Sequence, residues 1–280
     1  MGGVVRPCPL CGSQGWSPVF YRPLVRCRRC GLVFRTEYEA PHARLDDHER
    51  VQDRRGVLYG EFLQRFHPVP GRNRLLDVGC GAGEFLRQAK EAGWDVLGVE
   101  VAEEAVRVAR AAGLPVCPGS LATLGLPAAS FDAITFWDVL DFVADPVAEA
   151  REANRVLVPG GVLMLRVRNL AFHSAVYRLS RLVGWWPRLA LPLAKQYVFH
   201  QLSFNAWTLR RTLAEAGFGR IEVTNSAPTW GDPYATLPRG GDRLLQIAKR
   251  SVSGATSLIA TSTAGRLLWG SSLVARAVKG

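Results

Sequence analysis

The sequence predicts an α/β protein, a doubly wound Rossmann-like parallel sheet preceded by a small metal-binding ribbon. Three observations lead to this prediction. Short apolar runs alternate with amphipathic helical stretches from about residue 74 to residue 168, as they do in βαβ units. A glycine-rich turn joins the first apolar run to the helix that follows it. Two Cys-x-x-Cys pairs lie ahead of both, close to the N-terminus.

The two cysteine pairs predict a zinc site within a ribbon at residues 1–36. Fifteen residues separate the pairs, and a glycine that eases the tight turn follows each pair, as in four-cysteine zinc ribbons. Four thiolates complete the coordination of a zinc ion, so we expect a structural role. The alternative, a pair of disulfides, is disfavoured in a reducing compartment. The four expected ligands are Cys8, Cys11, Cys27 and Cys30.

The remaining elements follow from hydrophobic periodicity and from turn residues. A charged linker at 37–70 contains an expected helix from Asp46 to Phe66, and the main domain is expected at 71–250. An insertion is expected at 170–204 and a basic, apolar tail at 251–280. The predicted elements of the domain are strand 74–79, helix 83–93, strand 95–100, helix 103–113, strand 114–118, strand 131–137, helix 145–157, strand 161–168, helix 206–216 and a closing strand pair at 218–224 and 243–249.

The glycine-rich turn is the most informative part of the chain. A buried strand ends in Asp77 and enters a helix through three glycines at alternate positions. Glycine lets the backbone approach a ligand closely, and a helix N-terminus offers unpaired N–H groups. The spacing differs from that of dinucleotide sites, because Glu84 stands where their third glycine would be. The three glycines are Gly79, Gly81 and Gly83.

A second carboxylate supports a nucleoside site. The strand expected at 95–100 ends in Glu100, about 20 residues beyond the turn, where a ribose-binding acid is found in such folds. A carboxylate there accepts hydrogen bonds from both ribose hydroxyls. A cofactor is therefore expected at the carboxyl ends of the parallel strands.

In their order and spacing, the glycine turn, Glu100 and the predicted strands that follow resemble the class I S-adenosylmethionine-dependent methyltransferases. The stretch from about Pro7 to Lys249 is similar to members that carry an N-terminal zinc-binding ribbon. The resemblance implies a seven-stranded sheet and S-adenosylmethionine as the cofactor. It assigns cofactor contacts to the glycine turn, the ribose acid, the turn after the third strand and the end of the fourth strand. These residues are Asp77, Gly79, Cys80, Gly81, Gly83, Glu100, Ser120, Leu121, Trp137 and Asp138.

One position departs from the family pattern. After the fourth strand the family has Glu-His, whereas this chain has Asp141 and Phe142. The acid is kept and the histidine is lost. We expect His200, at the end of the insertion, to serve as the general base, because histidine titrates near neutral pH. Asp141, Tyr197 and His173 are the competing candidates, and in the alternative reading His200 only ties the insertion to the domain.

Charge restricts the partners. The net charge is +11, residues 1–36 carry six arginines and no acid, and residues 166–220 carry nine Lys or Arg and one acid. This excess indicates an anionic acceptor, an anionic membrane surface touched by the insertion and the tail, or RNA. No apolar run reaches the length of a membrane span, and no signal-peptide pattern precedes Cys8, so we expect a cytoplasmic protein.

The expected function is methyl transfer from S-adenosylmethionine to a small-molecule acceptor of the sugar, polysaccharide-precursor or secondary-metabolite type. Two alternatives stay open. An rRNA methyltransferase would hold RNA with the basic ribbon, and its binding would depend strongly on salt. A non-catalytic zinc-ribbon protein would have a degenerate methyltransferase domain, and the lost histidine is the only support for it.

Overall fold

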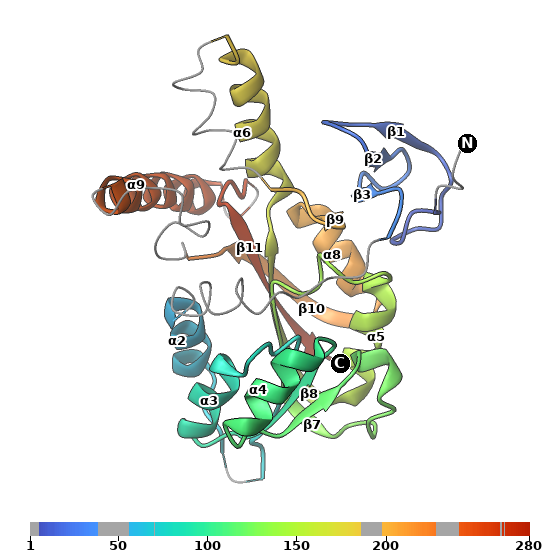
Figure 1. Ribbon diagram of the computed structural model, residues 1–280, viewed down its shortest axis with the longest axis vertical. Helices are drawn as coiled ribbons and strands as arrows, with labels where there is room; N and C mark the ends of the chain where they lie inside the picture. Colours follow the sequence, from blue (N-terminus) through green and yellow to red (C-terminus); the bar gives the residue numbers. More distant parts are fainter. Residues whose placement is uncertain are drawn as a thin grey trace.

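The computed structural model describes residues 6–38, 56–69, 71–185, 198–227, 241–263, 265 and 267–280. Seven strands form the central sheet in the order β10-β11-β8-β7-β4-β5-β6, and the pairs from β8 to β6 are parallel. The predicted α/β fold class is therefore confirmed (Figure 1). The strands are β4 (Arg74–Val78), β5 (Asp95–Glu100), β6 (Val116–Pro118), β7 (Phe131–Trp137), β8 (Leu157–Arg168), β10 (Phe218–Asn225) and β11 (Ser272–Lys279).

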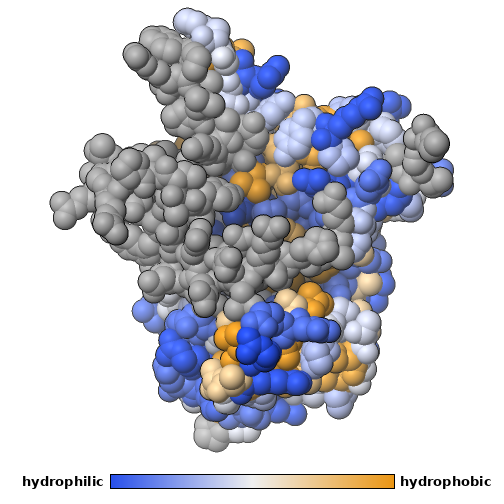
Figure 2. Space-filling view, viewed as in Figure 1, coloured by the Kyte–Doolittle hydropathy of each residue, from blue (hydrophilic) through white to orange (hydrophobic). Residues whose placement is uncertain are grey.

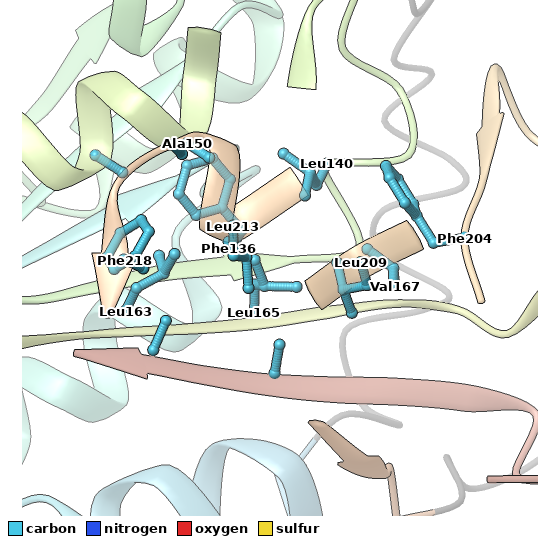
Figure 3. Close-up of a cluster of buried hydrophobic side chains, with 14 of the residues drawn as sticks. Phe136, Leu140, Ala150, Leu163, Leu165, Val167, Phe204, Leu209, Leu213 and Phe218 are labelled. Carbon is cyan, nitrogen blue, oxygen red and sulfur yellow. The ribbon is translucent and has the colours of Figure 1, made fainter. Parts of the chain in front are cut away.

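Helices pack on both faces of this sheet. One buried cluster joins Phe62 of α2 and Phe85 of α3 to Val106 of α4. Alternate residues of the strands point the other way, and there Phe136 and Leu165 meet Leu209 and Leu213 of α8 (Figure 3). The helices of these two layers are α2 (Gly56–Arg65), α3 (Glu84–Glu91) and α4 (Glu103–Ala111) on one side, and α5 (Pro146–Val156) and α8 (Ala206–Glu215) on the other.

Local capping signals set where two of the helices begin. The Asp145 carboxylate accepts hydrogen bonds from the N–H groups of Val147 (3.0 Å) and Ala148 (2.9 Å) at the start of α5. Asn205 does the same for the N–H of Thr208 (2.8 Å) at the start of α8. Each cap satisfies N–H groups that have no partner within the helix.

The predicted closing strand at 243–249 is wrong, because that stretch lies within α9 (Gly241–Ser262). Its apolar residues at 244, 245, 247 and 248 have helical spacing, and so short a run does not distinguish a strand from a helix. The seventh strand is β11, which pairs antiparallel with both β8 and β10. Most of the expected tail at 251–280 is thus part of the domain.

The ribbon and the domain share one sheet. Strands β1 (Trp16–Pro18), β2 (Leu24–Cys27) and β3 (Val33–Arg35) form the ribbon, and β9 (Leu202–Ser203) pairs antiparallel with β3 as a fourth strand. Phe34 is fully buried in the same cluster as Leu202 and Phe204. Figure 1 shows the ribbon beside β9 and α8. The ribbon is therefore packed onto the domain rather than tethered to it.

The expected insertion begins with α6 (Leu170–Leu182), which projects from the body of the molecule (Figure 1). The Tyr177 hydroxyl on α6 donates a hydrogen bond to the Phe20 carbonyl of the ribbon (2.8 Å). Residues 186–197 of the insertion, and 39–55 with the first part of the expected helix 46–66, lie outside the described residues. Among the helices that are described, none is long and apolar enough to cross a membrane.

Replacing Ala275 by Asp is expected to lower the free energy of unfolding by more than about 3 kcal/mol, because an unpaired charge would be buried in the sheet. Ala275 lies in β11 and is fully buried. Urea denaturation measures the effect, and the exposed neighbour Ser271→Asp is the control. A loss below about 0.5 kcal/mol, typical of surface positions, would contradict the placement of β11.

Candidate active site

The glycine turn between β4 and α3 depends on missing side chains. Gly79 and Gly83 have φ angles of +69° and +89°, which favour glycine. A Cβ atom at Gly79 would collide with the side chain of Val139, and one at Gly83 would collide with Leu114. Because Val139 follows β7, the loops after β4 and β7 are in direct contact at the carboxyl edge of the sheet.

Glu100 ends β5 and holds the turn in place. Its Oε2 atom accepts a hydrogen bond from the N–H of Gly81 (2.8 Å), and Oε1 accepts from Val101 (2.8 Å) and Ala102 (2.9 Å). The side chain is 5% exposed. Three charge-assisted hydrogen bonds stabilise the carboxylate where it is buried. The structure therefore brings the predicted ribose acid directly against the glycine turn.

Asp77 immediately before Val78 and Cys80 within the glycine turn are both buried, and their contacts help to fix the shape of the turn. The Asp77 carboxylate accepts a hydrogen bond from the Thr135 hydroxyl of β7 (2.7 Å), and both residues are buried. Burial, with the charges of Asp77 and Glu100, raises the pKa of the Cys80 thiol, so it stays protonated at neutral pH. Its Sγ lies against Gly98, where a Cβ would come within 2.6 Å of it. Cys80 thus contributes shape rather than reactivity.

The other predicted cofactor residues lie at the ends of neighbouring strands. Ser120 follows β6, and its hydroxyl lies 3.1 Å from that of Thr123. Leu121 begins the short 3₁₀ helix η1 (Leu121–Thr123) and is fully buried, so its side chain belongs to the core. Trp137, at the end of β7, packs in an aromatic cluster with Tyr59, at a ring-centroid distance of 5.5 Å. Ser120 is thus the more accessible of the two predicted residues that follow β6, because Leu121 is fully buried.

A buried ion pair lies next to these residues. Arg166 Nη1 is 2.6 Å from Asp138 Oδ2, and both side chains are less than 10% exposed. Arg166 also donates hydrogen bonds to the hydroxyls of Ser226 (3.2 Å) and Ser272 (3.0 Å). Arg166 and its neighbour Arg168 are not among the predicted site residues, although two arginines in the otherwise apolar strand β8 are a signal for buried charge. The pair fixes Asp138 at the edge of the site.

Asp141 and His200 lie close together just beyond β7. His200 Nε2 is 4.0 Å from Asp141 Oδ2, and the Asp141 side chain is 1% exposed. Burial raises the pKa of Asp141 to about 7. Burial and the charge of Arg168 lower the pKa of His200 to about 3. At neutral pH the imidazole is therefore uncharged, while the carboxyl group is partly ionised.

The ring of His200 also lies beside Phe142, with centroids 4.3 Å apart. His200 therefore occupies space next to the position where the family pattern has its histidine. His173 is not available as a base, because its Nε2 bonds the Ser271 carbonyl (3.1 Å) and its Nδ1 accepts from the N–H of Val198 (3.2 Å). Tyr197, the third candidate, lies outside the described residues.

The four cysteines of the ribbon meet as the spacing predicts. Their Sγ atoms all lie within 4.8 Å of one another, with Cys8 and Cys30, and Cys11 and Cys27, each 3.5 Å apart. Tetrahedral zinc with Zn–S bonds of about 2.3 Å separates its sulfurs by about 3.8 Å. None of the four is in a disulfide. The donor set and its geometry therefore fit a zinc ion.

The family described as "Methyltransferase domain" matches residues 51–223. A ubiquinone biosynthesis O-methyltransferase of Ralstonia nicotianae is 33% identical over 187 residues, which cover 63% of this chain and 73% of that protein. A protein of the same name from Idiomarina loihiensis is 30% identical over 125 residues, 41% of this chain. This second match spans about half of its relative, 51% of the length.

Solved structures share the fold. An S-adenosylmethionine-dependent methyltransferase of Mesorhizobium loti superposes with a TM-score of 0.52 at 25% identity, covering 81% of this chain and 99% of that one. Another, from Thermotoga maritima, gives a TM-score of 0.54 at 20% identity over 84% of this chain and 96% of that one, which supports the fold alone. Since the family match covers more than half of the chain, the protein belongs to the S-adenosylmethionine-dependent methyltransferases.

Proposed function

We propose that this protein transfers the methyl group of S-adenosylmethionine to a small-molecule acceptor of the sugar, polysaccharide-precursor or secondary-metabolite type. The observation that carries the proposal is the glycine turn, closed by the buried carboxylate of Glu100 at the carboxyl edge of the sheet. Backbone N–H groups and a carboxylate suit a ligand with a ribose and a charged amino-acid end. The names of the relatives favour a hydroxyl as the methylated group.

When bound, S-adenosylmethionine supplies a methyl group already activated by its sulfonium charge. The residues of the chain then have two tasks, which are to align the acceptor and to remove its proton. The Asp141–His200 pair suits the second task. The uncharged imidazole of His200 is able to accept the proton of the acceptor hydroxyl, but its pKa of about 3 makes it a weaker base than an ordinary histidine. The proposal therefore relies on the nearby Asp141 carboxylate to stabilise the imidazolium that forms.

Replacing Glu100 by Ala is expected to weaken S-adenosylmethionine binding by about 1–3 kcal/mol, the cost of hydrogen bonds to a charged group. Glu100→Gln keeps an acceptor oxygen for the turn and separates loss of charge from collapse of the loop. The exposed Glu104→Ala, in the first turn of α4, is the matched control. Calorimetry gives the affinities, and an unchanged value for both Glu100 variants would remove this residue from the site.

The thiolate set supports one tightly bound structural zinc per chain. Replacing Cys27 by Ser is expected to abolish zinc binding and to unfold the ribbon, because a segment this small relies on its metal. Part of the S-adenosylmethionine affinity should remain, since the glycine turn lies in the other sheet. Metal analysis and cofactor titration measure both effects, with Cys117→Ser as the control. Wild-type protein that is purified without chelator and holds no zinc would overturn this.

Replacing His200 by Ala is expected to lower turnover by about 10²-fold or more and to leave cofactor affinity intact. The control is His67→Ala, an exposed histidine beside the opposite ends of the strands. Turnover should also fall as the pH drops below about 7, because protonated Asp141 no longer stabilises the imidazolium. Near-normal turnover of His200→Ala would leave His200 with the structural role of tying the insertion to the domain.

The pKa of Asp141 also gives a stability test with a definite sign. A carboxyl pKa that is raised on folding stabilises the protein below the unfolded pKa, and this stabilisation is lost as the pH rises through the folded value of about 7. Asp141→Asn should therefore raise the melting temperature relative to wild type at pH 8, while it lowers turnover. Equal loss of stability and turnover at pH 8 would indicate a purely structural carboxylate.

The insertion supports contact with an anionic membrane surface. Leu179, Leu182 and Trp185 are exposed near the end of α6 beside Arg178 and Arg181, and Figure 2 shows hydrophobic and hydrophilic residues side by side where α6 projects. Apolar side chains next to basic ones bind such surfaces. Co-sedimentation with anionic liposomes at low salt should fall when Leu182 and Trp185 are replaced by Ser. Absence of any sedimentation would leave α6 as a lid on its own domain.

A further inference from the structure

A cavity of about 230 Å³ lies where the ribbon meets α6 and the start of α8. The side chains of α6 that line this cavity include the small residues Ala171 and Ala175, which leave space between α6 and the ribbon. Arg26 of β2, Arg178 of α6 and the indole of Trp269 line it as well. Drug-sized ligands fill pockets of about 300–1,000 Å³, so this space suits one functional group with a short body.

The polar groups around the cavity are donors. Neither Arg26 nor Arg178 makes an ion pair with any residue that the structure describes, and no acidic residue lines the space. The Nε of Arg26 is buried without a hydrogen-bond partner. Asn205 adds a third group, because the N–H of Thr208 uses its Oδ1 and leaves its amide nitrogen as a donor. A buried donor without a partner is costly, and an anion would relieve that cost.

We propose that this cavity binds a phosphoryl group. Two guanidinium groups match both the charge and the geometry of a phosphate dianion, and they donate to its oxygens in pairs. The small side chains leave room for the group, and Trp269 supplies an apolar wall for the atoms attached to it. A singly charged carboxylate would use the same donors with less charge compensation.

The cavity does not include Asp141 or His200, but a short stretch of chain links it to them. Asn205 lies five residues beyond His200, which is at most about 17 Å of extended chain. Leu202, between them, donates its N–H to the Asp141 carbonyl (2.9 Å). A phosphoryl group here is therefore the far end of an elongated acceptor or a separate anionic effector, and the first of these readings rests on the proposed function.

The test is calorimetric titration of the zinc-containing full chain with inorganic phosphate at pH 8 and constant ionic strength. One phosphate per chain is expected for wild type. Arg26→Gln and Arg178→Gln should each weaken binding by about tenfold or more, the effect of hydrogen bonds to a charged group. Ala175→Leu should abolish binding by filling the space, with both guanidinium groups in place. Arg181→Gln, exposed on the same helix and outside the cavity, is the matched control.

Absence of phosphate binding to wild type would overturn the proposal, as would an equal loss in Arg181→Gln or full binding in Ala175→Leu. Zinc content shows whether Arg26→Gln disturbs the ribbon. Arg178 is exposed on α6, so its replacement by Gln is not expected to unfold the ribbon. S-adenosylmethionine affinity, measured in parallel, should be unchanged in all four variants, so failure here is distinct from failure of the methyltransferase proposal. Added phosphate raises the KM of the acceptor without changing kcat if the two compete for the site, and changes kcat if phosphate is an effector that binds together with the acceptor.

Discussion

The pairing of β3 with β9 joins the ribbon to the segment that carries His200, and the position of His200 beside Asp141 depends on it. Val33 and Phe34 pair with Ser203 and Leu202, and the Leu202 N–H bonds the carbonyl of Asp141. His200 precedes β9 by two residues. The cysteine cluster lies in the ribbon, β3 of the ribbon pairs with β9, and the first residue of β9 bonds the backbone of Asp141 close to His200. Under the proposed function, a zinc ion held by the four cysteines would therefore influence the Asp141–His200 pair without contacting it.

The parts of the fold that sequence predicts well are those fixed by local chemistry. The cysteine spacing, the glycine turn with Glu100, and the capped helices at Asp145 and Asn205 all lie where a short stretch of chain sets its own conformation. The sequence pattern did not reveal β9 or β11, because each is defined by a partner far along the chain. Residues 243–249 show the same limit, since a run of seven residues has no periodicity long enough to separate a helix from a strand.

The buried charges around the site mark a second limit. Arg166, Asp138 and Asp141 are in an interior that disfavours ions, and their roles follow from partners on other strands. The same applies to His173, whose two ring nitrogens are used by the backbone. The basic excess of the ribbon is also partly internal. Arg6 donates to the Arg35 carbonyl (3.1 Å), and Arg26 faces α6. The ribbon therefore has fewer arginines available to contact the phosphate backbone of an RNA than its composition indicates.

The position of β11 has a consequence for how the chain reaches its native state. The strand pairs with β8 across about 100 residues of sequence and separates β8 from β10. Until β11 arrives, β10 has no neighbour in the sheet, and both β8 and β10 expose backbone groups that another chain could pair with. Closing so long a loop is slow. Any molecule in which β11 has not yet paired therefore has an open sheet, and its unpaired strand edges favour aggregation.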